Sequence, residues 1–137
     1  MELADLLKAI IEHNNTKGGY QIHLNSGDLD DRSNKHTGVE FSDLYFTECT
    51  TLSNTTLLCF GNMNRQPVSK KEDGTNLYPS EINSQMFIDI NKIETIEDVK
   101  DFEDWFLFPS ERVINIYMLP ENEKTNCRNV VTIGFME

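Results

Sequence analysis

Hydrophobic residues near the N-terminus repeat with the period of an amphipathic helix. They fall at i, i+3, i+4, i+7 and i+8, which places them on one face of a helix. The members of this stripe are Leu3, Leu6, Leu7, Ile10 and Ile11. The pair Gly18–Gly19 follows and is typical of a helix stop. We therefore predict a helix that begins near residue 3 and ends before Gly18.

The next segments alternate with the period of a β-strand. Tyr20, Ile22 and Leu24 share one face of a predicted strand, and residues 25–28 (Asn-Ser-Gly-Asp) favour a turn. Residues 28–38 are polar and predict a loop or a strand end. Further on, the apolar residues 39 and 41 occupy odd positions, whereas the apolar residues 44 and 46 occupy even positions. In a regular strand these two pairs would face opposite sides. A β-bulge near Ser42–Asp43 would place both pairs on one face.

Four further strands and a long loop follow. Residues 55–60 are almost continuously apolar, which predicts a strand inside the sheet. Residues 61–80 contain turn residues and predict a loop, and residues 86–90 alternate again. Strands at about 112–119 and 129–135 predict a C-terminal hairpin. Across that hairpin Ile114, Ile116 and Met118 are expected to face Val131, Ile133 and Phe135.

Between these strands the pattern changes to a helical period. Val99, Phe102 and Phe106 would line one face of a helix near 96–107, with Thr95 as its N-cap and Pro109 at its end. The element order is then helix, antiparallel strands, helix and hairpin, without regularly alternating βαβ units. This order predicts an α+β fold with a strongly bent antiparallel sheet. The length favours one domain spanning residues 1–137.

Three segments of the chain resemble the Sm-like small β-barrel. They are "YQIHLNSGDLDD", "VEFSDLYF" and "FIDINKIETIE", within residues 3–97. The resemblance implies an N-terminal helix that leads into a strongly bent, small-barrel-like sheet. Members of that family generally bind RNA through two loops, but no matching RNA-binding motif is present in this chain. We therefore carry over the architecture alone.

The charge balance restricts the kinds of partner that the protein can bind. Twenty-three acidic residues against twelve basic ones give a net charge of −11. Such a field opposes binding to nucleic acid or to an anionic membrane, and it either keeps the protein soluble or steers it to a basic partner. No run approaches the roughly 18 apolar residues of a membrane helix, and the N-terminus lacks a secretory pattern. With three cysteines and no CxxC, we expect a cytoplasmic protein with reduced thiols.

No catalytic or metal-binding motif is assembled in the sequence. His13, His23 and His36 are ten and thirteen positions apart, which is not the i, i+4 spacing of ligands on a helix. There is no GxSxG motif and no glycine-rich phosphate loop. Cys59 lies in an apolar strand and is expected to be a small buried side chain. We expect a non-enzymatic protein without a cofactor, a metal or catalytic residues.

The acidic charge is concentrated in one segment. Residues 94–111 hold seven acids and one base, more than half of the net charge. On the predicted helix Glu97, Asp101 and Asp104 would form an acidic face, with Trp105 at the margin of the apolar stripe. This face is either simply solvated or a partner-binding surface, in which acids steer a basic partner and the tryptophan anchors it.

Three functions fit these observations. The first is an acidic protein that inhibits or neutralises a basic, nucleic-acid-handling partner, which resembles in type the phage anti-defence proteins (anti-CRISPRs among them) and toxin-immunity proteins. The second is a small-ligand binder that holds a nucleotide or another anion with Arg65, Lys70 and Lys71. The third is a structural or homo-oligomeric subunit that pairs strands through the C-terminal hairpin.

Overall fold

The computed structural model describes residues 1–16, 18–28, 35–52, 55–61, 69–77, 85–102, 105–120 and 127–137. One helix precedes the strands, which form a large sheet and a small two-stranded ribbon. The elements are α1 (Leu3–Asn14), β1 (Tyr20–Asp28), β2 (Lys35–Leu52), β3 (Thr55–Gly61), β4 (Ser69–Lys70), β5 (Asn76–Leu77), β6 (Gln85–Asp89), the 3-10 turn η1 (Ile90–Lys92), β7 (Ile93–Val99), β8 (Ser110–Met118) and β9 (Cys127–Met136). The predicted α+β class with an antiparallel sheet is confirmed.

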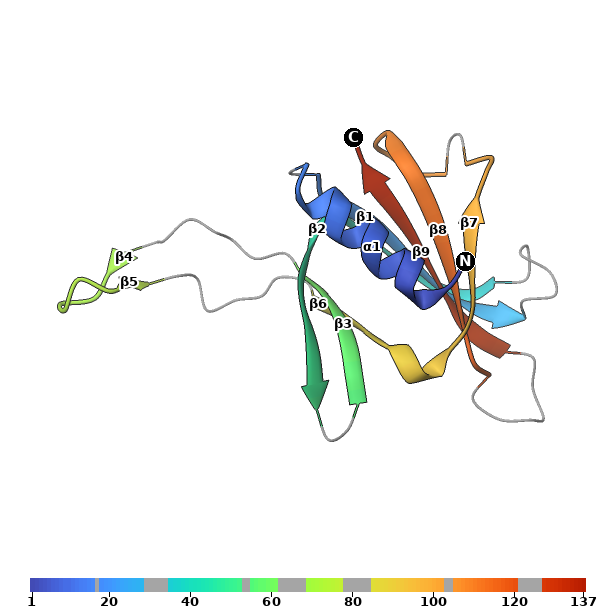
Figure 1. Ribbon diagram of the computed structural model, residues 1–137, viewed down its shortest axis with the longest axis horizontal. Coiled ribbons are helices and arrows are strands. Elements are labelled where there is room, and N and C mark those ends of the chain that lie inside the picture. Colours follow the sequence, from blue (N-terminus) through green and yellow to red (C-terminus); the bar gives the residue numbers. More distant parts are fainter. Residues whose placement is uncertain are drawn as a thin grey trace.

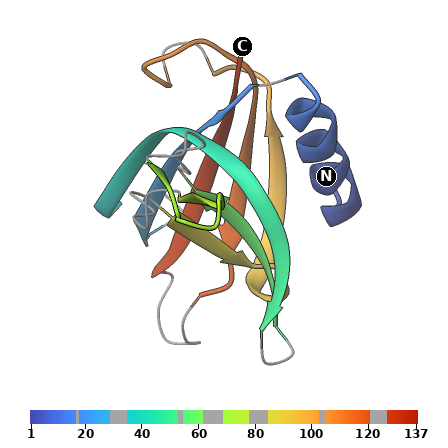
Figure 2. The same ribbon diagram turned by 90° about the vertical axis from the view of Figure 1, so that its left-hand side faces the viewer.

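The large sheet has the strand order β6-β3-β2-β1-β9-β8-β7, and all of its pairs are antiparallel. Strands β6 and β7 are its edges, so the sheet is open. Figure 2 shows β2 curving through a wide arc, and Figure 1 shows α1 lying across the sheet. The curvature brings the two edges close enough for the three-residue turn η1 to join them.

The strand β2 bends where the sequence predicted a bulge. Leu44 pairs with Tyr20 and Phe41 with Ile22, so two residues, Ser42 and Asp43, stand opposite one. The extra residue corrects the parity of the apolar positions, as expected. A second shift lies between Phe46 and Glu48 of the same strand.

One core cluster fills the space between α1 and the sheet. From the helix Leu6, Ala9 and Ile10 enter it, as the helical stripe predicted. Because strand side chains alternate, every second residue of each strand faces this inner side, and these positions are mostly apolar. The strand part of the cluster consists of Tyr20, Ile22, Leu44, Leu58, Phe60, Met86, Ile88, Ile96, Ile114, Ile116, Val131, Ile133 and Phe135. Cys59 is buried, as predicted.

The C-terminal hairpin is confirmed as strands β8 and β9. Ile114 pairs with Ile133 and Ile116 with Val131. The expected partner of Phe135 was wrong, because Arg112 rather than a residue of the apolar series stands opposite it. A bulge between Ser110 and Arg112 shifts the register there.

Three other sequence predictions are corrected. The predicted helix near 96–107 is absent from the described residues: Ile93–Val99 is strand β7, and residues 100–102 and 105–109 have neither helix nor strand structure. The predicted turn at 25–28 belongs to β1, which pairs with β2 and β9 along its whole length. Within the predicted loop at 61–80, the short strands β4 and β5 form a ribbon around Gly74.

Candidate functional site: a strap across the outer face

A segment between β7 and β8 folds back over the outer face of the sheet. We call residues 100–109 the strap; the structure describes its residues 100–102 and 105–109. Its position is fixed by Gln21, a β1 side chain that is only 2% exposed. The Gln21 amide oxygen accepts a hydrogen bond from the Phe108 N–H (3.0 Å), and its Nε2 donates to the Phe108 carbonyl (2.9 Å). A side chain thus pairs with the strap as a neighbouring strand would.

Phe106 attaches the strap to the sheet by close packing. A Cβ placed on Gly134 would lie 2.9 Å from the Phe106 ring and 2.7 Å from the Ser110 hydroxyl, so only glycine leaves room for this contact. The Phe106 ring also lies 4.3 Å from the imidazole of His23, measured between ring centroids. Beneath this contact Val99 and Val113, which face the outer side, are buried. The strap therefore covers one end of the outer face.

The strap carries apolar side chains into solvent. Leu107 is 86% exposed and Phe108 is 44% exposed, although both belong to a backbone that is fixed to the sheet. Beside them is a hollow of about 220 Å³. It is lined by Phe102, Phe106, Leu107, Phe108, Pro109 and Ser110.

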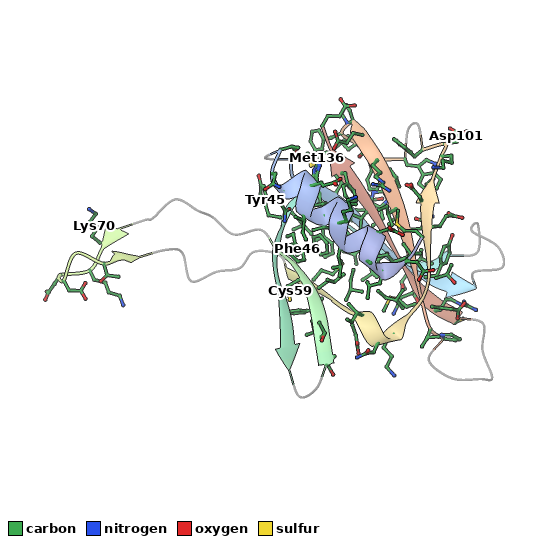
Figure 3. The ribbon with its side chains drawn as sticks, in the orientation of Figure 1. Tyr45, Phe46, Cys59, Lys70, Asp101 and Met136 are labelled. Atoms are coloured by element: carbon green, nitrogen blue, oxygen red, sulfur yellow. The ribbon has the colours of Figure 1, made fainter. Side chains whose placement is uncertain are left out.

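Acidic residues lie close in sequence to this apolar surface. Asp101 is exposed and lies beyond the end of β7 (Figure 3). Glu111 is the second residue after the strap; its side chain is 54% exposed and contacts His13 of α1. Glu137 is also exposed, and its backbone N–H donates to the Pro109 carbonyl (3.3 Å). Three acids thus lie within two residues of the hollow or are hydrogen-bonded to its lining.

The nearby bases are engaged with a different acid. Arg112 donates two hydrogen bonds to Asp98, from Nε (3.3 Å) and from a terminal nitrogen (3.0 Å). Lys100 Nζ lies 3.7 Å from the same carboxylate. The hydrogen bond from Arg112 holds the pKa of Asp98 below its ordinary range, and the charge of Lys100 adds to this effect. The field around the strap is therefore negative.

A buried histidine ties α1 to the start of β8. The Nδ1 of His13 lies 3.0 Å from Glu111 Oε1, and its Nε2 lies 3.0 Å from the Gly19 carbonyl oxygen. Both partners are acceptors, so a protonated ring is the form that donates to both. The ring packs edge-on against Tyr20 and Phe135. Burial raises the pKa of Tyr20 well above its ordinary range.

A row of polar side chains crosses the outer face beside the strap. Consecutive strands place Glu97, Asn115, Thr132, His23 and Glu40 opposite one another. Thr132 donates to Asn115 (2.6 Å), and Asn115 donates to Glu97 (3.1 Å). Both polar atoms of the Asn115 amide are therefore used in this series, and Asn115 and Thr132 are buried. This row stabilises the strand pairing and explains how polar residues are accommodated here.

The predicted partner-binding residues are separated by the structure. Asp101 and Trp105 both belong to the strap, where Asp101 is exposed and Trp105 is half-buried. Glu97 does not join them, because it lies in β7 and accepts hydrogen bonds from Asn115 (3.1 Å) and Tyr117 (3.5 Å). Asp104 lies outside the described residues. The predicted acidic face on a helix was wrong; two of its three described residues, Asp101 and Trp105, belong to the same strap.

The predicted anion-binding residues lie on a different part of the chain. Lys70 and Lys71 are exposed on the β4–β5 ribbon, which Figure 1 shows apart from the large sheet, and Figure 3 labels Lys70 there. Glu72 and Asp73 follow them in the same ribbon and are equally exposed. Arg65 lies outside the described residues. The anion-binding role stays a prediction.

A larger groove lies between α1 and strands β7 and β8. Its volume is about 440 Å³, and its lining mixes both signs of charge. The residues are Met1, Asp5, Lys8, Ala9, Glu12, Asp98 and Arg112. Arg112 and Asp98 are bonded to each other within it. Among the residues that the structure describes, no group of three histidine, cysteine or acidic side chains could hold a metal ion.

Sequence reasoning missed the residues that matter most to this surface. Leu107 stood at the end of the predicted helix near 96–107, and neither Phe108 nor Gln21 was singled out as a candidate. A signal was present in the run Trp105–Pro109, because four consecutive large apolar residues exceed what one helical stripe can bury.

In the described part of the chain, no helix is long and apolar enough to cross a membrane. No family model, no curated protein and no solved structure matches this chain.

Proposed function

We propose that the protein is a non-enzymatic binding protein that inhibits or neutralises a basic partner protein by covering its surface with the strap. The observation that carries this proposal is the exposure of the adjacent residues Leu107 and Phe108 on a fixed backbone, within an acidic segment of the chain. Contiguous exposed apolar side chains are typical of interaction sites. Acidic groups around it raise the association rate with a basic surface and oppose acidic competitors.

The acidic charge also argues for a basic partner over self-association. Two copies that each carry a net charge of −11 repel one another, most strongly if their acidic segments meet. A partner that handles nucleic acid has the opposite charge on its binding surface. We therefore propose a nucleic-acid-handling protein as the target, as anti-defence and immunity proteins have. The Sm-like resemblance adds an architectural prediction and no RNA-binding role.

Site-specific photo-cross-linking in the cells that produce the protein tests the proposal. A benzophenone amino acid at position 107 is expected to capture a protein with a basic surface. The matched control places the same group at Ile11, which is 60% exposed on α1. Capture of the same proteins from both positions, or none from position 107, would contradict the proposal.

The captured partner then allows a test of the charges. Changing Asp101 and Asp104 to Lys should lower the association rate by roughly tenfold or more and flatten its salt dependence. Glu97→Lys is not an equivalent change, because Glu97 accepts two hydrogen bonds in the outer polar row. Association that is unchanged by the double reversal would remove electrostatic steering from the proposal.

The two alternative functions stay predictions with their own tests. Thermal stabilisation by a nucleotide that depends on Lys70 and Lys71 would favour the ligand-binding function. A concentration-dependent mass in light scattering would favour the oligomeric subunit.

A further inference from the structure

We infer that His13 is a proton-dependent clamp: its protonated ring holds α1 to the start of β8, and its neutral ring releases that contact. This inference goes beyond the proposed function, because it concerns how the fold beside the strap responds to pH rather than which partner binds. The clamp joins the last turn of α1 to Glu111, which lies two residues after the end of the strap.

The His13 ring is buried and has an acceptor at each nitrogen. Its side chain is 2% exposed. Nδ1 lies 3.0 Å from Glu111 Oε1, and Nε2 lies 3.0 Å from the Gly19 carbonyl oxygen. A neutral imidazole has one N–H and one lone pair, so it donates at one end only and places a lone pair against an oxygen at the other. Only the protonated ring satisfies both contacts.

Close packing fixes the ring in this orientation. The rings of Tyr20 and Phe135 lie edge-on against it, with centroids 5.0 Å and 5.2 Å away. A Cβ on Gly18 would collide with the imidazole, so only glycine lets the backbone pass this close to it. The ring therefore cannot turn away from an unfavourable contact. The Glu111 side chain, which is 54% exposed, is the partner that can move.

When the ring is neutral, its remaining proton is expected on Nε2. The Gly19 carbonyl is held in place, because it also accepts a hydrogen bond from the Met136 N–H (3.0 Å). The Glu111 carboxylate, by contrast, can turn into water and be hydrated there. Loss of the proton therefore opens the contact between α1 and β8 and keeps the contact with Gly19.

Among the described residues, Glu111 is the charged group that faces the ring. Tyr20 of β1 also contacts it, but burial raises the pKa of its hydroxyl well above its ordinary range, so this group stays uncharged. Phe135 of β9 does not titrate. On α1 itself, Lys8 and Glu12 are exposed and pair with each other (4.0 Å). Carboxylates stay ionised above about pH 5.5, so a change in this contact near neutral pH belongs to the imidazole.

Nuclear magnetic resonance of the ring nitrogens tests the clamp directly, in a titration between about pH 5.5 and 8.5. At the acidic end we expect a proton on both nitrogens of His13, and at the basic end a proton on Nε2 alone. The backbone amide shifts of residues 19, 111 and 136 should follow the same titration curve. Residue-specific ring signals separate His13 from the other histidines.

Glu111→Gln is the decisive variant, because an amide can donate as well as accept. Its NH₂ group can donate to Nδ1 of the neutral ring, which then keeps both of its contacts. The amide shifts of residues 19 and 136 should therefore lose most of their pH dependence. The matched control is His23→Gln, which removes a second histidine beside the strap. His23 lies 4.3 Å from the Phe106 ring between centroids, and its Nε2 lies 3.8 Å from Glu40. This control should leave the response at residues 19, 111 and 136 unchanged.

Three results would overturn the inference. They are a His13 ring that carries one proton at the acidic end, a response of equal size in Glu111→Gln, and a response that disappears in His23→Gln. None of these measurements involves the partner. Cross-linking from position 107 therefore decides the proposed function separately from the clamp.

Discussion

The side-chain amide of Gln21 pairs with the backbone of Phe108 on both its N–H and its carbonyl, at 3.0 Å and 2.9 Å. Gln21 lies in β1 and Phe108 in the strap, so the pair connects the centre of the sheet to its most exposed apolar surface. The Gln21 amide therefore makes the pair of hydrogen bonds with Phe108 that a residue of a neighbouring strand would make. Loss of the Gln21 side chain would leave the N–H and the carbonyl of Phe108 without this partner.

Replacing Gln21 by Ala should therefore loosen the strap. We expect the free energy of unfolding to fall by about 1–3 kcal/mol, since buried polar groups lose their hydrogen bonds. Hydrogen exchange should become faster at the Phe108 amide while amides of β8 keep their protection. Asn91→Ala, at an exposed position in η1, is the control. Unchanged exchange at Phe108 would mean that packing alone holds the strap.

A methyl group at position 134, on the sheet beneath Phe106, should also displace the strap. In Gly134→Ala the new Cβ would lie 2.9 Å from the Phe106 ring, so the ring has to move. We expect a loss of about 1–3 kcal/mol in urea unfolding, typical of overpacking. Adding Phe106→Leu should recover part of this loss, because the smaller side chain leaves room. Strictly additive effects of the two changes would contradict the contact.

The His13–Glu111 pair predicts an unequal response to mutation of its two members. His13 is 3% exposed and bonds on both ring nitrogens, so His13→Ala should lower the free energy of unfolding by about 2–4 kcal/mol. Glu111→Gln keeps an acceptor on a half-exposed side chain and should lower it by at most about 1 kcal/mol. Denaturant unfolding of both variants at one pH measures the order. A larger effect at Glu111 would contradict it.

The Asp98–Arg112 pair predicts an acid-dependent loss of stability. The pKa of Asp98 is lower in the folded chain than in the unfolded one, chiefly because Arg112 donates to its carboxylate. The folded state then binds fewer protons, so this contribution is complete above the unfolded pKa of about 3.9 and is lost as the pH falls through the folded pKa. Asp98→Asn should flatten the unfolding free energy below about pH 4. Glu72→Gln, on the exposed ribbon, should leave that slope unchanged.

Local patterns predicted the elements in which the core-facing apolar residues follow one regular period. The stripe of α1, the bulge at Ser42–Asp43 and the C-terminal hairpin each follow from such a series, although β8 and β9 are buried on both faces. Strand β7 was mistaken for a helix because Val99 is followed by Phe102 and Phe106 at helical intervals of three and four. Val99 is the last residue of β7, whereas Phe102 and Phe106 belong to the strap. The apparent stripe therefore combined residues of two different segments.

The turn predicted at residues 25–28 failed for a related reason. Its Asn-Ser-Gly-Asp sequence favours a reversal when it is considered alone. Strands β2 and β9 pair with these residues on both sides, and those two ladders outweigh the local preference. Only some residues of the candidate site were predicted from the sequence. Acids and Trp105 were expected to lie together, but Gln21 and Gly134 were not expected to hold the segment in place.

The pairing of β1 with β9 has a consequence for how the chain reaches this structure. Strands β1, β2 and β3 form one antiparallel series, which β6 extends, and β7, β8 and β9 form another. The β1–β9 ladder between the two series joins segments as distant along the chain as Tyr20 and Phe135. Because closing a long loop loses more entropy than closing a short one, we expect this ladder to be the slow step of folding. Until it forms, β1 and β9 each expose an unpaired edge of apolar residues, and the protein is then most prone to aggregation.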